Sequence, residues 1–140
     1  MTTAVDTNVS IALWDAAPTL SGAAQKALDK ALGEGDLVVS VPVYSELMAA
    51  PERGEVFLDR FFRDTGILVD WRLDEVVWRA AGRAFRGYAS RRKKERSPGP
   101  RRILADSLIG AHAFHRGYRL LTMDERIYRA AFPGLKIEGV

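Results

Sequence analysis

Residues 104–124 read LADSLIGAHAFHRGYRLLTMD and combine an apolar helical pattern, a glycine and a short strand-like run. Small and apolar side chains recur at helical spacing over residues 103–116, and Gly117 is a typical helix C-cap. The run YRLLT, residues 118–122, follows at once. A helix that leads directly into a short buried strand is typical of a parallel α/β sheet.

Four more strand-like runs lie along the chain, separated by helical patterns. They cover residues 2–6 (TTAVD), 36–41 (DLVVSV), 66–70 (GILVD) and, more weakly, 135–139 (LKIEG). The predicted helices span 21–33, opened by Ser21, then 41–48 with Ser40 as N-cap, 55–64, and 73–96, which the SPGP segment at 97–100 ends. We find no repeats and predict one domain over residues 1–140, a parallel sheet covered by helices on both faces.

The charge of the chain is concentrated in one segment. The net charge is +3, but residues 91–102 (RRKKERSPGPRR) contribute +6, so the other 128 residues sum to −3. A basic run is often a solvated helix end, yet it also suits a phosphate backbone. The chain has no cysteine, no signal-type start and no apolar run that could span a bilayer, which favours a soluble protein of the reducing cytoplasm.

Asp106 is the one residue that the apolar helical pattern does not explain. It shares a helix face with Ile103, Gly110 and Ala113, where an unpaired buried carboxylate would cost several kcal/mol. We therefore expect a compensating group elsewhere in the chain.

Three further carboxylates fall where a parallel sheet gathers its functional groups. Asp6 closes the first strand, Glu46 lies in the helix after the second, and Asp124 follows the fourth. Singly, each is explained as a helix N-cap or a solvated side chain. Together with Asp106 they predict one shared acidic pocket.

The electrostatics of such a pocket indicate a metal. Two unit charges about 6 Å apart at an effective dielectric of about 20 repel by about 3 kcal/mol, and four carboxylates form six such pairs. Hard divalent ions, Mg²⁺ or Mn²⁺, bind carboxylate oxygens and would neutralise the pocket. Acid clusters with such ions hydrolyse phosphodiesters, so the pocket and the basic segment predict the same substrate, a phosphate backbone.

The sequence resembles the PIN domain, most closely the VapC-type toxins of bacterial toxin–antitoxin pairs, over nearly its full length. Three stretches carry the resemblance: AVDTNVSIALW at 4–14, SELMAA at 45–50 and DSLIGAHAFHRGYRLLTMDERIYRAAFPGLKI at 106–137. The third holds the most diagnostic spacing, with Asp106 followed by Ile109, Ala111, Ala113, Gly117, Leu121, Thr122 and Asp124.

The resemblance implies a three-layer α/β/α fold around a mostly parallel sheet of four or five strands. It further implies Mg²⁺- or Mn²⁺-dependent endoribonuclease activity, frequent homodimers and inhibition by a small cognate antitoxin of the VapB type. By resemblance, the metal-binding and catalytic acids would be Asp6, Glu46, Asp106 and Asp124, with Asn8 and Thr122 orienting them or a water.

The basic segment is longer and more basic than a minimal family member needs before the third acid. We predict that it binds RNA rather than the antitoxin, because phosphate binding explains both its charge and its position next to Asp106. The residues predicted to contact RNA are Arg91, Arg92, Lys93, Lys94, Arg96, Arg101 and Arg102.

Alternatives to a toxin stay open on the sequence alone. The same fold could serve as a catalytically silent RNA-binding or scaffold module, or as an RNA-processing nuclease that is not a toxin. A phosphotransfer enzyme with Asp6 as nucleophile has less support, since DTN lacks a second acid two residues on.

Two other groups of residues are assigned no catalytic role. His112 and His115 lack the spacing of a zinc protease motif. The large aromatic side chains are expected to serve core or oligomer packing. They are Trp14, Trp71, Trp78, Phe57, Phe61, Phe62 and Phe85.

Overall fold

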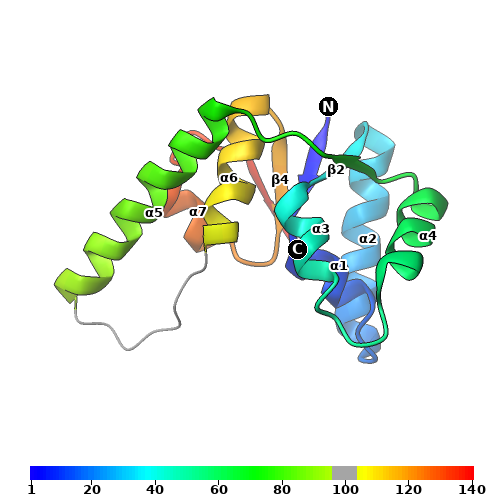
Figure 1. Ribbon diagram of the computed structural model, residues 1–140. Helices are drawn as coiled ribbons and strands as arrows, with labels where there is room; N and C mark the ends of the chain where they lie inside the picture. Colours follow the sequence, from blue (N-terminus) through cyan, green and yellow to red (C-terminus); the bar gives the residue numbers. More distant parts are fainter. Residues whose placement is uncertain (96–103) are drawn as a thin grey trace.

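A sheet of five parallel strands, flanked by helices, forms the centre of the molecule (Figure 1). In this computed structural model, which describes residues 1–95 and 104–140, the strands are β1 (Thr3–Val5), β2 (Leu37–Ser40), β3 (Leu68–Asp70), β4 (Arg119–Thr122) and β5 (Ile137–Gly139). Their order is β3-β2-β1-β4-β5, and every neighbouring pair is parallel. The predicted three-layer α/β/α architecture is confirmed.

The described residues form seven helices. They are α1 (Thr7–Leu13), α2 (Pro18–Glu34), α3 (Val41–Leu47), α4 (Glu55–Thr65), α5 (Glu75–Glu95), α6 (Leu104–Arg116) and α7 (Glu125–Ala131). None of these helices has the length and hydrophobicity that a membrane span requires. The SPGP segment at 97–100, which is predicted to end the helix that corresponds to α5, lies outside the described residues.

Helix α2 begins earlier than the sequence predicts. Its first residue is Pro18, and Ala17 occupies the N-cap position, whereas Ser21 was expected to open the helix. Proline fits the first helical position because its fixed φ is already helical and its missing N–H has no partner there. The Ser21 hydroxyl instead donates to the Ala17 carbonyl at 3.2 Å, inside the helix.

The order of the strands reverses between β1 and β4, in the middle of the sheet. From β1 the chain moves outward through β2 to β3, and after α5 and α6 it returns to the other side of β1 as β4. In open parallel sheets, a crevice forms at such a reversal, outside the carboxyl ends of the strands. The topology therefore places a crevice beside the ends of β1 and β4.

The large aromatic residues follow the predicted core packing only in part. Trp14 packs edge-on against Phe57 and Phe61, with ring centroids 5.4 and 5.0 Å apart. In contrast, Trp71 and Trp78 remain 63% and 49% exposed, so a role in the core of this chain is wrong for these two. Their predicted role in oligomer packing stays a prediction.

Gly110, in the middle of α6, allows α7 and the residue after it to pack closely on that helix. A Cβ at this position would collide with the ring of Phe132 and would lie 3.1 Å from Cδ1 of Tyr128. Both rings are buried, so neither can move into solvent without losing its packing. The glycine in the apolar helix is thus a requirement of helix contact.

We predict that Gly110→Ala lowers the free energy of unfolding by about 1–3 kcal/mol, because the added methyl overpacks a filled core. Urea denaturation measures the change. Gly82→Ala is the matched control, since a Cβ at Gly82 on α5 meets no atom within 4 Å, and it should be neutral or slightly stabilising. Equal stability of the two variants would contradict the packing argument.

Candidate active site

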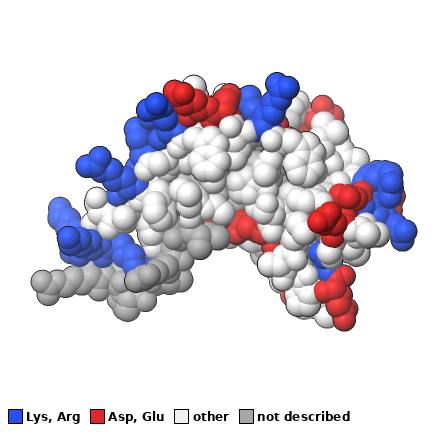
Figure 2. Space-filling view, in the orientation of Figure 1, with Lys and Arg blue, Asp and Glu red and all other residues white. Residues whose placement is uncertain are grey.

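A cavity of about 290 Å³ opens where β1 and β4 end, and all four predicted carboxylates line it. The lining residues are Asp6, Thr7, Asn8, Ile11, Glu46, Asp106, Asp124, Ile127 and Tyr128. Acidic side chains are visible in the hollow on the underside of the molecule (Figure 2). The structure thus brings together side chains from four helical regions that lie far apart in the sequence.

Asp6 is the most buried of the four carboxylates, at 4% exposure. It follows β1 directly and is the N-cap of α1. Its Oδ1 accepts a hydrogen bond from the Thr7 backbone N–H at 2.8 Å, and its Oδ2 accepts one from the Thr122 hydroxyl at 2.7 Å. Burial raises the pKa of Asp6 above its ordinary value, the bond from Thr122 lowers it, and the charge of Asp106 raises it further.

Two threonines tie the neighbouring acidic segments to Asp6. The Thr7 hydroxyl donates to Oε1 of Glu46 at 2.7 Å, which joins α1 to α3. The Thr122 hydroxyl oxygen accepts from the Asp124 backbone N–H at 3.0 Å while it donates to Asp6. A continuous chain of hydrogen bonds therefore runs from Glu46 through Asp6 to the start of α7.

Glu46 and Asp106 add negative charge to the same cavity. Burial raises the pKa of Glu46, the bond from Thr7 lowers it, and the charge of Asp6 raises it again. Asp106 lies half-buried in the first turn of α6, where the helix dipole favours a carboxylate. Asp124 occupies the N-cap position of α7 but makes no side-chain capping bond, so the predicted capping role is not what places it here.

Asn8 holds the backbone of the site rather than a carboxylate. Its side-chain oxygen accepts from the Met123 backbone N–H at 3.2 Å, which joins α1 to the turn after β4. Thr122 contacts Asp6 itself. The two residues that the resemblance assigned to orientation therefore act in different ways.

Neither Thr7 nor Tyr128 stands out in the amino-acid sequence as a site residue. Thr7 lies in the middle of the DTN triplet, which gives a weak signal at most. Tyr128 is 2% exposed and lines the cavity, and its hydroxyl interacts with the Asp6 carboxylate, although the two groups do not form a hydrogen bond of good geometry. Burial raises the pKa of Tyr128, and the charges of Asp6 and Asp106 raise it further, so the phenol stays protonated.

His112 and the described residues among the predicted RNA contacts do not line the acidic cavity. His112 is buried in α6 with Nε2 2.8 Å from Oδ2 of Asp70 at the end of β3, and burial lowers its pKa although Asp70 opposes this. Of the predicted RNA contacts, Arg91, Arg92, Lys93 and Lys94 lie in the last turns of α5. The others, Arg96, Arg101 and Arg102, lie outside the described residues.

The donor set of the cavity fits a hard divalent cation. Its charged ligand groups are carboxylates, the oxygen donors that Mg²⁺ and Mn²⁺ prefer. Burial, and to a smaller extent a neighbouring carboxylate, raises the pKa of both Asp6 and Glu46. No three His, Cys, Asp or Glu side chains of residues 1–95 and 104–140 already stand as a ready set of ligands. Binding one ion would therefore require some of these carboxylates to move closer together.

Comparison with known proteins agrees with this architecture. The sequence model of the PIN domain family matches residues 3–133. The chain belongs to the PIN domain family. No curated protein matches the sequence significantly.

Solved structures with the same fold cover nearly the whole of this PIN domain. VapBC2 from Rickettsia felis, bound to a DNA fragment from its promoter, shares 16% identity over 100% of this chain and 99% of its own, with a TM-score of 0.63. VapBC-1 from nontypeable Haemophilus influenzae shares 20% sequence identity over 99% of this chain and 98% of its own, with a TM-score of 0.64. A chain of a toxin–antitoxin complex from Klebsiella pneumoniae shares 16% sequence identity over 95% of this chain and 94% of its own, with a TM-score of 0.56.

We predict that Asp6→Asn stabilises the metal-free protein at neutral pH. Because folding raises the pKa of Asp6 above 3.8, this carboxyl favours the folded state only while protonated, and that contribution is lost as pH rises through the raised value. Removing the charge should add on the order of 1 kcal/mol at pH 7.5, and the gain should vanish toward about pH 3. Urea denaturation in EDTA at several pH values measures it.

Asp29→Asn, at an exposed position of α2, is the control for the loss of one carboxylate. It should leave the free energy of unfolding within about 0.5 kcal/mol at every pH. An Asp6→Asn variant no more stable than this control at pH 7.5 would show that the cavity does not disfavour the charge.

Proposed function

We propose that this PIN domain is a Mg²⁺- or Mn²⁺-dependent endoribonuclease that acts as a VapC-like toxin and is inhibited by a VapB-type antitoxin. One observation carries the proposal: four carboxylates, Asp6, Glu46, Asp106 and Asp124, line a single cavity at the carboxyl ends of β1 and β4. A phosphodiester is the substrate class that such a cavity serves when divalent ions offset its charge.

The chemistry of hydrolysis divides between the ion and the protein. A bound Mg²⁺ or Mn²⁺ lowers the pKa of a water and offsets the charge of the phosphate. Thr7 and Thr122 hold Asp6 from both sides, so one carboxylate keeps a fixed direction toward the cavity. Thr7 holds Glu46 in the metal-free protein, and Asp106 and Asp124 line the same cavity and would complete the ligand set.

Tyr128 supplies a neutral donor to this acidic cavity. Its hydroxyl is buried and protonated, and it interacts with Asp6 without a hydrogen bond of good geometry, so it can turn to donate to a phosphate oxygen. A donor that needs no deprotonation and lies beside Asp6 suits the orientation of an anionic substrate.

RNA and an antitoxin are the proposed macromolecular partners. The basic end of α5, seen as Lys and Arg along one edge in Figure 2, supports a phosphate backbone as substrate. The VapBC complexes that share this fold support a small protein partner that silences the site, and a homodimer remains part of the proposal. The cytoplasm, where RNA is found, is the proposed location.

We predict that the wild-type chain cleaves single-stranded RNA with Mn²⁺ or Mg²⁺ and that EDTA stops the cleavage. Asp6→Asn should slow cleavage on the order of 100-fold or more, because the most buried carboxylate of the cavity loses its charge. Gel analysis of a labelled RNA measures the rates, with Asp29→Asn as the active control. Cleavage by Asp6→Asn at the wild-type rate would refute the site, whereas no metal-dependent cleavage by the wild-type chain would favour a catalytically silent RNA-binding module.

We predict a separation of stability from activity at Tyr128. Tyr128→Phe keeps the ring against α6 and removes a hydroxyl that interacts with Asp6 without a hydrogen bond of good geometry, so the free energy of unfolding should change by less than about 1 kcal/mol. The turnover number for RNA cleavage should fall roughly tenfold if the hydroxyl orients the phosphate. Unchanged turnover in a folded Tyr128→Phe enzyme would remove Tyr128 from the mechanism.

A further inference from the structure

A second, larger hollow lies beside the acidic cavity, between α5 and the neighbouring helices α6 and α7. Its volume is about 420 Å³. The wall from α5 is made of small residues and two arginines, Arg83 and Arg91, and the opposite wall carries Phe114 and Phe132. Phe114 is 41% exposed, so its ring faces the solvent at this hollow.

A smaller cavity of about 150 Å³ joins this hollow to the acidic site. It shares Arg91 and Phe132 with the larger hollow, and it shares Asp106, Ile127 and Tyr128 with the acidic cavity. The three spaces therefore form one groove that ends at the carboxylates, and Tyr128 lines its inner part.

The two arginines of the groove are not used by the fold. Neither Arg83 nor Arg91 has an ion-pair or hydrogen-bond partner within residues 1–95 and 104–140. A Cβ at Gly87 would lie 3.3 Å from Nη1 of Arg91, so the guanidinium lies over the helix face that borders the groove. Among the described residues that line the outer hollow, none is a carboxylate.

The arginines stand at helical spacing on one face of α5. Positions 83, 87 and 91 are four residues apart, which puts the two guanidinium-bearing residues about 12 Å apart along the helix axis. This separation lets them contact different phosphates of one strand. An exposed phenylalanine across the groove offers a surface on which a base can stack.

We propose that this groove binds a single RNA strand that runs from the acidic cavity along α5, with Arg83 and Arg91 on its phosphates and Phe114 under a base. The proposal rests on the proposed function, since it extends the substrate of the same site. Charge complementarity and the continuity of the groove with the carboxylates favour a nucleic acid over an apolar peptide. A single strand fits better than a duplex, whose paired bases cannot stack on Phe114.

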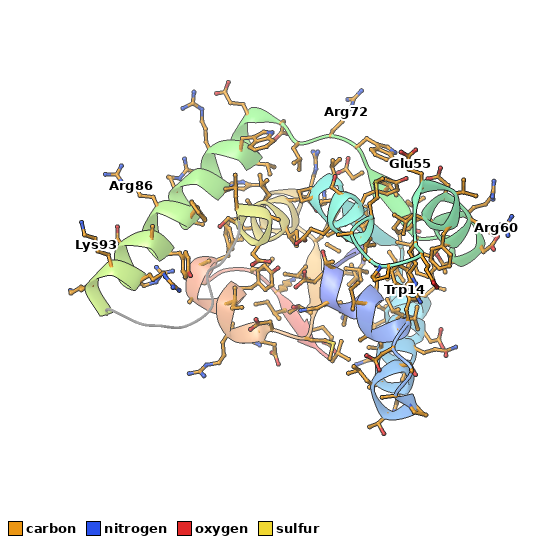
Figure 3. All side chains as sticks on the ribbon, turned by 60° about the horizontal axis from the view of Figure 1, so that its bottom comes forward. Trp14, Glu55, Arg60, Arg72, Arg86 and Lys93 are labelled. Atoms are coloured by element: carbon orange, nitrogen blue, oxygen red, sulfur yellow. The ribbon has the colours of Figure 1, made fainter. Side chains whose placement is uncertain are left out.

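The test compares two double variants with equal loss of charge. Arg83→Gln with Arg91→Gln alters the groove, and Arg60→Gln with Arg86→Gln is the control. Arg60 lies on α4, and Arg86 points away from α6 and α7 on the outer side of α5 (Figure 3). Fluorescence anisotropy with a labelled, unstructured RNA of twelve nucleotides measures binding in EDTA, where metal-dependent turnover is absent.

The groove variant should bind this RNA roughly tenfold more weakly than the control, and the slope of log Kd against log salt should fall by about 1.4, at about 0.7 for each lost phosphate contact on a single strand. Phe114→Leu should weaken binding and leave that slope unchanged, because stacking releases no counterion. Circular dichroism confirms that all variants are folded.

Equal affinity of the two double variants would overturn the proposal and leave the groove to a protein partner. A wild-type dimer that becomes a monomer only in the groove variant, measured by sedimentation, would assign the groove to a second copy and overturn it as well. The two proposals fail separately. RNA bound in the groove but never cleaved refutes the nuclease alone, whereas a nuclease with unaltered binding in the groove variant refutes the groove alone.

Discussion

The parallel pairing of β1 with β4 sets the geometry of the acidic cavity. Val5 stands opposite Leu121, and the Asp6 backbone N–H donates to the Leu121 carbonyl at 2.9 Å. This register brings the Thr122 hydroxyl within 2.7 Å of the Asp6 carboxylate. A shift of one residue would turn Thr122 to the other face of the sheet and break the connection between Asp6 and the start of α7.

The cavity works against the stability of the fold. Burial raises the pKa of Asp6, and the charge of Asp106 raises it further, so an ionised Asp6 is disfavoured in the folded chain. The buried Tyr128 hydroxyl, which interacts with Asp6 without a hydrogen bond of good geometry, adds a second unfavourable feature, and packing of its ring on Gly110 holds it in place. Unfavourable features of this kind are typical of binding sites. They agree with a site in which a bound cation offsets the negative charge and a substrate accepts from the hydroxyl.

The sheet and the position of the acids were predictable because they follow from local patterns. Short apolar runs predict the five strands, and the rule that parallel strands end at one edge predicts that Asp6 and Asp124 meet there. Asp106 stands in an apolar helix because it lines the cavity at this same edge of the sheet. These inferences need only the order of elements along the chain.

What the sequence did not predict depends on contacts between distant segments. The bond from Thr7 to Glu46 joins residues 39 positions apart, and nothing in the DTN triplet indicates it. Tyr128 looks like an ordinary core residue of a short helix until α6 places its ring beside Asp6. Trp71 and Trp78 are exposed because of the face of the molecule on which they lie, and the composition of the chain does not determine that face.

The role of the α5 arginines also could not be predicted from the sequence, because it depends on contacts between distant segments. The sequence drew attention to the dense basic run at the end of the helix, whereas Arg83 lies outside that run and is notable only because α5 packs beside α6 and α7. The groove leads from the guanidinium groups of α5 to the cluster of carboxylates. The positive and the negative side chains would therefore act on the same bound strand. Positive charge would hold the strand, and negative charge would hold the ion that acts on it.

Anomalous diffraction from crystals soaked in Mn²⁺ would locate the ion itself. The account predicts a manganese peak in the cavity at the ends of β1 and β4, within coordination distance of oxygens from Asp6 and Asp106, with Glu46 turned from Thr7 toward the ion. A manganese peak at another place, or an empty cavity at Mn²⁺ concentrations that support RNA cleavage, would contradict it.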